Sequence, residues 1–415
     1  MEAGGCVIIR NAKIVSAKGI REVDILIEGE RIRKVGKRVS CSGEETVDAA
    51  GLYAFFGGMD AHVHFRVPGA EWKEDFYTGT CAALAGGITT VLDMPNTNPP
   101  TISVNALGQK KEMARKDSVC DFGFHFGATE NNFEEVKKAS PSSLKIYMGQ
   151  STGGMAISES AIRRHFLEFE KEKPICIHAE DEKLAHELGE RNAFVSSSAV
   201  CKAIAWAGEC KRRVHLCHAS TNTEIILAKS YAKASVEAAP HHLFLSQKDE
   251  ARLGVCREVR PPLRGEEDRA TLWGALAQVD IIASDHAPHT LSEKKEGACG
   301  FPGVQTMLPL MLDSAKKGRI TLEEVARLLC SNPPKIFGIE GKGEIKEGNF
   351  ADIVLVNMEK KWKVKGEKMF SKCGWTPYEG MELFGVIEKV FLRGETAFEE
   401  GEVIAKRGSG KLVMH

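Results

Sequence analysis

The central part of the chain alternates between short apolar runs and longer stretches in which apolar residues recur at helical spacing. Eight apolar or β-branched runs predict strands, at residues 53–64, 88–93, 119–127, 143–148, 174–178, 213–218, 235–239 and 280–285. Amphipathic stretches between them predict helices, for example at 79–85, 158–171, 199–211, 221–234 and 269–277. This alternation predicts an α/β fold of the (β/α)8 type, the TIM barrel.

The two ends of the chain contain strand-like runs without helical spacing, at 6–14, 23–28 and 31–36 and again at 348–356, 386–394 and 394–403. We expect residues 1–52 and 341–415 to join into one small β domain beside a barrel formed by residues 53–340. An open doubly wound sheet is the alternative, but the first strand is not followed by the Gly-x-Gly-x-x-Gly pattern of that fold.

Composition narrows the class of protein. The formal net charge is −1, so no overall field attracts nucleic acid or anionic lipid, and we expect neither as a partner. No apolar run approaches the length of about 18 residues that suggests a membrane span. The twelve cysteines form no Cys-x-x-Cys pair, which favours reduced thiols in a cytoplasmic protein.

Two histidines follow the apolar run of the first predicted barrel strand. His62 and His64 are separated by one residue, so in a strand both imidazoles point to the same face. Two imidazoles on one face form half of a site for a divalent metal such as zinc. Either histidine alone could instead be a buried core residue with its hydrogen bonds satisfied.

Further residues of the kinds found in metal centres stand at the ends of other predicted strands: Lys145, His178, His218 and Asp285. In a (β/α)8 barrel the chemistry lies at the carboxyl ends of the strands. The coincidence of these residues across five strands indicates one common centre more strongly than any single motif.

The motifs around these residues resemble those of the amidohydrolase superfamily and, within it, the dihydroorotase group. Residues 60–69, Asp-Ala-His-Val-His-Phe-Arg-Val-Pro-Gly, and residues 283–289, Ala-Ser-Asp-His-Ala-Pro-His, are similar to its two signatures. Shorter segments are also similar, at 93–97, 143–147, 177–180, 239–242, 260–263 and 300–303. The resemblance covers nearly the whole chain.

This resemblance implies two zinc ions per chain, one held by His62, His64 and Asp285 and the other by His178 and His218. It also implies that Lys145 bridges them as a carbamate formed with carbon dioxide. A protonated ammonium cannot bind a dication, whereas low dielectric and neighbouring cations lower the pKa of a lysine and favour the neutral amine that carbon dioxide modifies. An unmodified structural Lys145 is the alternative.

The activity implied by the resemblance is the reversible cyclisation of N-carbamoyl-L-aspartate to L-dihydroorotate in pyrimidine biosynthesis. A hydroxide between the metals would attack the ring amide, and Asp285 would carry the proton to the leaving nitrogen. Both compounds carry a carboxylate, which the guanidinium of Arg66 can bind with two parallel hydrogen bonds.

By resemblance, Asn96, His289 and Gly303 also belong to the substrate site. Arg260 differs from the asparagine that many bacterial relatives carry there, and it either contacts the substrate or forms a salt bridge at the barrel rim.

Several features stay open. The glycine-rich segment 149–154 either closes as a lid, with Ser151 or Thr152 donating a hydrogen bond, or is a plain connector. Strand alternation favours Cys217 as a packing residue, with a third metal bound by Cys217 and Glu237 as the minor alternative. His241 and His242 either orient ligands or end a loop.

Two other functions remain possible. Allantoinases and the hydrolases of hydantoins and dihydropyrimidines share this metal set, although Arg66 and Asn96 favour a substrate with a carboxylate. A non-catalytic barrel serving as a scaffold is the second alternative, but such a protein is expected to lose metal ligands. A homodimer or a complex with aspartate transcarbamoylase is the expected assembly.

Overall fold

The computed structural model describes residues 6–41, 45–150 and 153–413. Among these residues, eight parallel strands form the barrel wall: β6 (Gly58–Val63), β7 (Ile88–Asp93), β8 (Asp121–Phe124) continued by β9 (Phe126–Gly127), β10 (Leu144–Tyr147), β11 (Ile175–His178), β12 (Val214–Leu216), β13 (Ala234–Ala238) and β14 (Ile281–Ile282). The ring closes where the His64 N–H donates to the His286 carbonyl at 2.8 Å. The predicted (β/α)8 barrel is confirmed.

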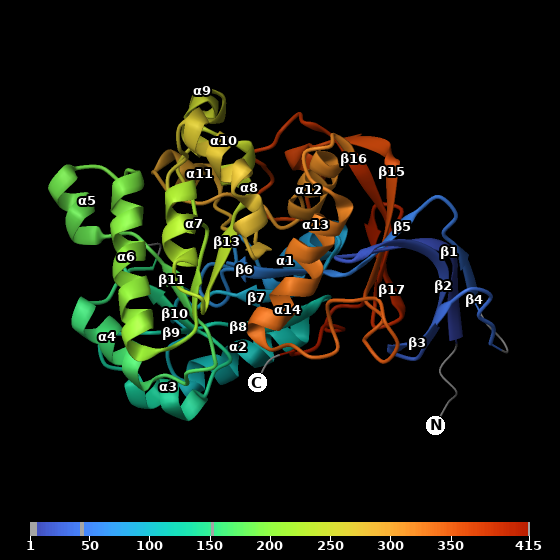
Figure 1. Cartoon of the computed structure of the whole chain (residues 1–415), viewed down its shortest axis with the longest axis horizontal. Helices are drawn as coiled ribbons and strands as arrows, with labels where there is room; N and C mark the ends of the chain where they lie inside the picture. The colour runs from blue at the N-terminus through green and yellow to red at the C-terminus, as the bar shows by residue number, and fades with distance from the viewer. Residues whose placement is uncertain (1–5, 42–44, 151–152, 414–415) are drawn as a thin grey trace.

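Helices surround the strands (Figure 1). They are α1 (Phe76–Ala85), α2 (Val104–Asp117), α3 (Phe133–Ala139), α4 (Glu159–Glu168), α5 (Glu182–Leu188), α6 (Ala193–Cys210), α7 (Asn222–Lys229), α8 (Pro240–Phe244), α9 (Glu250–Leu253), α10 (Glu266–Gly274), α11 (Leu291–Lys295), α12 (Met307–Lys316), α13 (Leu322–Ala326) and α14 (Asn332–Phe337). Two helices begin earlier than the predicted starts at 79 and 199, each directly after a capping side chain: α1 follows Asp75, which accepts from the Thr78 N–H, and α6 follows Asn192. Within the described residues, no helix combines the length and apolarity needed to cross a membrane.

Both ends of the chain contribute to one sheet, which lies to the right of the barrel in Figure 1. Its strands are β1 (Cys6–Ser16), β2 (Gly19–Glu28), β3 (Arg31–Gly36), β4 (Glu45–Asp48), β5 (Tyr53–Phe56), β15 (Ile353–Lys363), β16 (Glu382–Leu392), β17 (Glu395–Glu399) and β18 (Glu402–Val403). The N-terminal and C-terminal parts meet because β5 pairs with both β1 and β15. The small β domain formed by the two ends is therefore confirmed.

The single strand expected at 53–64 is two strands. β5 belongs to the terminal sheet and β6 to the barrel, and Gly57 separates them. A Cβ atom at Gly57 would lie 2.1 Å from the Thr89 hydroxyl oxygen, so only glycine fits where the chain passes from one sheet to the other. Apolar periodicity could not reveal this division, because both strands are buried.

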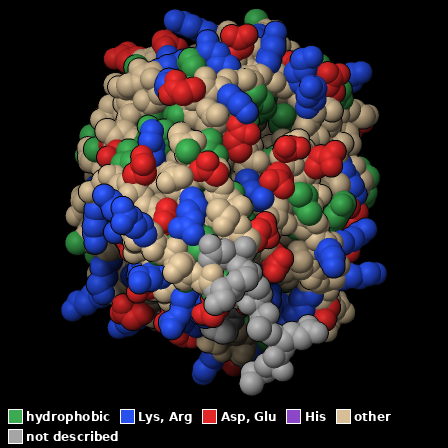
Figure 2. Space-filling model, turned by 90° about the vertical axis from the view of Figure 1, so that its right-hand side faces the viewer, with side chains coloured by type: hydrophobic (Ala, Val, Ile, Leu, Met, Phe, Trp, Pro, Cys, Tyr) green, Lys and Arg blue, Asp and Glu red, His purple; other side chains and the backbone are tan. Residues whose placement is uncertain are grey.

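The face of the molecule on the β-domain side carries interspersed charges. Figure 2 shows lysine and arginine side chains mixed with aspartate and glutamate, and hydrophobic side chains only in small groups. Such a mixture is typical of a solvated surface.

One expectation about the cysteines is wrong. Cys6 and Cys41 form a disulfide, although all thiols were expected to be reduced. The start of β1 and the segment after β3 pack around Leu26 and Val39, which brings the two sulfurs together. A separation of 35 residues in the sequence gave no sign of this proximity.

A buried ionic network joins the barrel to the β domain. The Lys342 side chain is 3% exposed, and its ammonium lies 2.8 Å from Asp121 at the start of β8 and also contacts Asp352 beside β15. Arg393, after β16, pairs with Asp121 and donates its backbone N–H to Asp352 at 2.8 Å. Burial disfavours the charge on Lys342, but the two carboxylates outweigh it and raise the pKa of Lys342.

We expect Lys342→Met to lower the free energy of unfolding by about 3–5 kcal/mol, because it leaves two buried carboxylates short of a partner. Lys346→Met is the matched control, since the Lys346 ammonium is exposed and lies 3.9 Å from Glu344. Its loss should cost less than about 1 kcal/mol. Urea denaturation of both variants measures the difference, and equal midpoints would contradict the structural role of the network.

Candidate metal centre

A narrow cleft opens at the carboxyl ends of the barrel strands. The six predicted metal ligands line it together with three of the predicted substrate residues: His62, His64, Lys145, His178, His218, Asp285, Arg66, Asn96 and Arg260. The strands end at this edge of the barrel, so residues up to 223 positions apart in the sequence face one space.

One group of candidate ligands combines the first strand with the last. His62 and His64 come from β6 and the residue after it, and Asp285 follows β14. The Nε2 atoms of the two histidines lie 3.3 and 3.2 Å from Asp285 Oδ1, and the ligand atoms of all three lie within 4.8 Å of one another. All three side chains are buried.

A second pair of histidines lies beside this group. His178 ends β11 and His218 follows β12, and His178 Nδ1 is 3.0 Å from His218 Nε2. The two rings are nearly perpendicular, at 72°. The His218 Nδ1 atom has no hydrogen-bond partner among the described residues.

Three of the four histidines are held from behind by an oxygen acceptor. Glu237 contacts His62 Nδ1 at 2.6 Å, Asn96 contacts His64 Nδ1 at 2.7 Å, and Glu180 contacts His178 Nε2 at 2.9 Å.

Each of these contacts fixes the ring and leaves the other nitrogen next to another candidate ligand, Asp285 or His218, as is usual for histidines that bind metals. The donor set therefore fits divalent metal ions, with imidazole and carboxylate ligands in each other's reach.

Lys145 faces the same space from β10. It is completely buried, and its ammonium donates to Cys217 Sγ at 3.1 Å. Burial lowers the pKa of Lys145, but Cys217 and Glu237 outweigh it and raise the pKa above its usual value. The expected lowering of this pKa depends on cations bound next to Lys145, and it stays a prediction.

The carboxylate and the first histidine of the centre hold opposite charges. Burial favours the neutral form of Asp285, but His62, His64 and His218 outweigh it and hold its pKa well below the usual range. Burial likewise opposes the charge on His62, while Glu237 and Asp285 raise its pKa to about 10. Asp285 is thus ionised at neutral pH.

Left-handed backbone conformations cluster at this site. Arg66, His218 and Asp285 have φ angles of 64°, 36° and 46°, which cost free energy in residues with a side chain. Asp60 stabilises two neighbouring segments by accepting the backbone N–H groups of His62 at 3.1 Å and Ser284 at 3.0 Å. All three residues with this strained backbone line the cleft.

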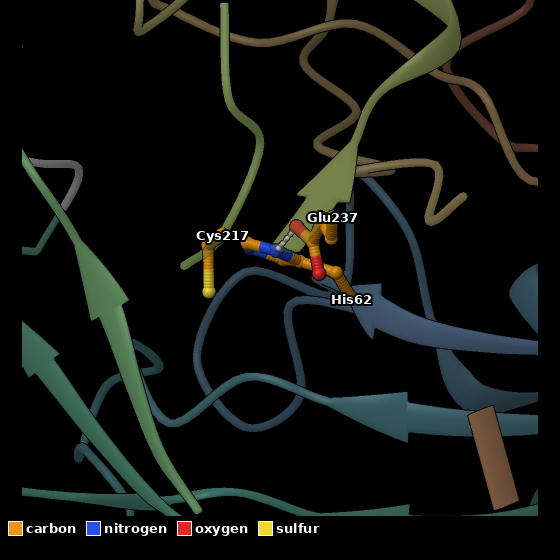
Figure 3. A group of neighbouring side chains, drawn as sticks. All are labelled: His62, Cys217 and Glu237. Atoms are coloured by element: carbon orange, nitrogen blue, oxygen red, sulfur yellow. Dashed lines mark hydrogen bonds and ion pairs between the residues drawn. The ribbon is translucent and has the colours of Figure 1, made fainter. Parts of the chain in front are cut away.

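Cys217 does not behave as a plain packing residue. Its sulfur accepts from Lys145, and Cys217 forms a further group with His62 and Glu237 whose ligand atoms lie within 4.8 Å (Figure 3). Alternation fails as a guide here because β12 ends at Leu216 and the chain turns at His218. The Glu237 carboxylate already binds His62 Nδ1, so a third metal at this group stays a prediction.

The predicted carboxylate clamp is partly assembled. Arg66 is 5% exposed, donates to the Pro288 carbonyl at 3.2 Å and lies 3.1 Å from His289 Nε2. His289 supports Arg66 but does not line the cleft. Burial and the cations Arg66 and Lys73 lower the pKa of His289 to about 2, so the imidazole is neutral.

Two other predicted substrate residues have different surroundings. Arg260 lines the cleft and donates to the Gln150 carbonyl at 2.9 Å, a contact that is not the salt bridge considered as an alternative. Gly303 does not line the cleft; its N–H faces His286 Nδ1 at 3.1 Å. Gly300 of the same motif lines the cleft instead, because the chain turns there with a φ of 142°.

Ser151 and Thr152 lie outside the described residues. His241 and His242 are buried on α8, and His242 Nε2 lies 3.0 Å from the Pro261 carbonyl, which leaves their role open.

Sequence reasoning missed several residues at the cleft. Tyr147, Ala287, Cys299 and Gly300 line it, and Glu180 holds His178. Tyr147 could have been found, because it stands two residues after Lys145 on the same strand face. The others lie in loops, where no periodicity marks the direction of a side chain.

Comparison with known proteins identifies the family of this chain. The model of the amidohydrolase family matches residues 53–397. A dihydroorotase of Methanosarcina acetivorans is 38% identical, across 98% of this chain and 94% of its own length. The multifunctional protein pyr1-3 of Dictyostelium discoideum is 37% identical across 85% of this chain, a match that spans 15% of that protein.

Among solved structures, the L-hydantoinase (dihydropyrimidinase) from Arthrobacter aurescens has a TM-score of 0.94 at 29% identity, and the match covers 99% of both chains. The family match extends over most of this chain, and the relative from Methanosarcina is similar over nearly all of it. The chain belongs to the amidohydrolase family.

Proposed function

We propose that this chain catalyses the dihydroorotase reaction, the reversible cyclisation of N-carbamoyl-L-aspartate to L-dihydroorotate. The observation that carries the proposal is the buried guanidinium of Arg66 at the edge of a cleft lined by metal-type ligands. A buried cation beside such a centre suits a substrate with both a carboxylate and a hydrolysable amide. The similarity to dihydroorotases over nearly the whole chain supports the same reaction.

Two zinc ions per chain are the proposed cofactor, one held by His62, His64 and Asp285 and the other by His178 and His218. Lys145, modified to a carbamate, would bind both. When bound, such ions acidify water and polarise the amide carbonyl. The outer contacts of the histidines with Glu237, Asn96 and Glu180 support this assignment.

In ring opening, Asp285 is the proposed proton carrier. Its carboxylate is ionised at neutral pH, so it can accept the proton of the attacking water. It then gives this proton to the ring nitrogen as the C–N bond breaks. In ring closure the nitrogen bonds to the carboxylate carbon and gives up its proton to the oxygen that departs, and the protonated Asp285 supplies the second proton, so this oxygen leaves as water.

Arg66 is the proposed anchor for the substrate carboxylate, with Asn96 and Arg260 as the further predicted contacts that line the cleft; His289 and Gly303, also predicted from the sequence, do not line it. His289 holds Arg66 in position, since its neutral imidazole lies 3.1 Å from the guanidinium.

The hydrolysis of dihydroorotate, followed by ultraviolet absorbance, tests the proposed function, with hydantoin, dihydrouracil and allantoin as competing substrates. We expect a clear preference for dihydroorotate. A hydantoinase is the second candidate, because the Arthrobacter structure superimposes so closely. A higher kcat/KM for hydantoin or dihydrouracil would favour that candidate and contradict the proposal.

We expect Arg66→Ala to weaken transition-state binding of dihydroorotate by about 2–5 kcal/mol, mainly through KM, because the substrate carboxylate loses its buried partner. Arg66→Lys should also be poor, since an ammonium cannot form the same two parallel hydrogen bonds. Arg163→Ala is a suitable control, because Arg163 is 57% exposed and pairs with Glu209 on the surface. Wild-type kinetics in Arg66→Ala would contradict the clamp.

The assembly is a further proposal. The match to one part of the Dictyostelium multifunctional protein supports an association with other enzymes of the same reaction sequence, with aspartate transcarbamoylase as the proposed partner and a homodimer as the alternative. A cytoplasmic location stays a prediction.

A further inference from the structure

Tyr147 is the last residue of β10 and lies in the wall of the cleft. Its side chain is 2% exposed, yet its hydroxyl has no hydrogen-bond partner among the described residues. Tyr147 follows Lys145 by two positions, so both side chains leave the strand on the same face. The hydroxyl is thus a buried polar group in the wall of the cleft for which the described part of the chain supplies no partner.

Tyr147 stands beside two of the candidate metal ligands. The Lys145 ammonium lies 5.2 Å from the centre of the Tyr147 ring, and the ring centroid of His178 lies 5.9 Å away. A phenol O–H is a hydrogen-bond donor at neutral pH.

An unpartnered buried hydroxyl destabilises a folded protein, and phenylalanine would fill the same space without that cost. The contrast with Tyr231 is direct. The Tyr231 hydroxyl donates to the carbonyls of Ala207 and Arg212, at 3.1 and 3.0 Å, on the outside of the barrel. Tyr231 thus has partners within the fold, whereas the described residues offer none to the Tyr147 hydroxyl, and a molecule bound in the cleft that Tyr147 lines could supply one.

We propose that Tyr147 is a catalytic residue whose O–H donates a hydrogen bond to the carbonyl oxygen of the cyclic amide. This inference rests on the proposed function and adds a group to it. As the water oxygen bonds to the carbonyl carbon, the π electron pair moves onto the carbonyl oxygen, and the hydrogen bond to Tyr147 strengthens. The pair then returns, the C–N bond breaks, and the nitrogen takes its proton from Asp285. Tyr147 keeps its own proton.

The test is Tyr147→Phe, which removes only the hydroxyl. We expect kcat for dihydroorotate to fall by about 10²-fold with KM within a factor of three, since the bond matters most in the transition state. The melting temperature should stay equal or rise, because no hydrogen bond within the fold is lost. The zinc content should equal that of the wild type.

Tyr231→Phe is the matched control, with the opposite pattern expected. It should melt at a lower temperature, because two carbonyls lose their donor, and it should keep wild-type kcat and KM.

Three outcomes would overturn the assignment: a kcat of Tyr147→Phe within twofold of the wild type, a loss confined to KM, or a lowered melting temperature and zinc content that account for the lost activity. Failure of the proposed function is seen separately, in the wild type. If the wild type prefers hydantoin, the same comparison is made with hydantoin, whose ring amide develops the same negative oxygen.

Discussion

Asp285→Asn is expected to lower kcat by about 10²–10⁴-fold in both directions while the protein keeps its fold and much of its metal. Asparagine preserves the size of the side chain and one oxygen near His62 and His64, but it has almost no basicity. The structure supports this expectation because the pKa of Asp285 is held well below its usual range, so the carboxylate is ready to accept a proton at neutral pH.

The pH profile gives a second check on Asp285. Ring opening needs the ionised carboxylate, so its rate should fall as the pH falls toward the depressed pKa. Ring closure needs the protonated form, which becomes more abundant at lower pH, so cyclisation should be favoured in acid. The two directions should therefore show opposite pH preferences. A metal-replete Asp285→Asn enzyme with normal turnover in both directions would rule out the role.

Lys145→Ala should abolish activity and most metal binding, since it removes the group proposed to bridge both ions. The Lys145 ammonium is buried next to the carboxylate and imidazole ligands, so no exposed side chain can take its place. Short carboxylic acids added with zinc should restore part of the activity, because they can occupy the space of the carbamate.

Metal analysis and kinetics with and without acetate or propionate measure this effect. Electron density at Lys145 in a fully metallated crystal is an independent check and should extend beyond the amine. Density for an unmodified lysine there would contradict the bridge. Lys137→Ala, on the surface helix α3, is the control and should bind metal like the wild type.

The candidate site was predicted from the sequence to a large extent, because its residues are tied to strands. Apolar runs mark where strands end, and a barrel gathers those ends at one edge, so His62, Lys145 and His178 could be expected together. Site residues that lie in loops were harder to predict from the sequence. Gly303 stands in the expected motif, but the turn at Gly300 directs it to His286 and away from the cleft.

For the fold, too, local features could be predicted from the sequence, whereas contacts between distant segments could not. The period of apolar residues along the chain reports which face of an element is buried. This local signal was sufficient to identify the barrel, the β domain of the two ends and the order of strands and helices along the chain. It carries no information on which partner covers a buried face. The split of residues 53–64 into β5 and β6, the Cys6–Cys41 disulfide and the Lys342 network all depend on such partners.

The candidate site shows the same contrast between what the sequence predicts and what only the tertiary structure determines. Residue types and spacing were enough to nominate the metal ligands and Arg66. Only the packed structure determined that Glu237 and Glu180 hydrogen-bond to the histidines and that Cys217 faces Lys145. It also showed that the described residues offer no partner to the Tyr147 hydroxyl. Hydrogen bonds between distant segments depend on distances of a few tenths of an ångström, which strand periodicity does not encode.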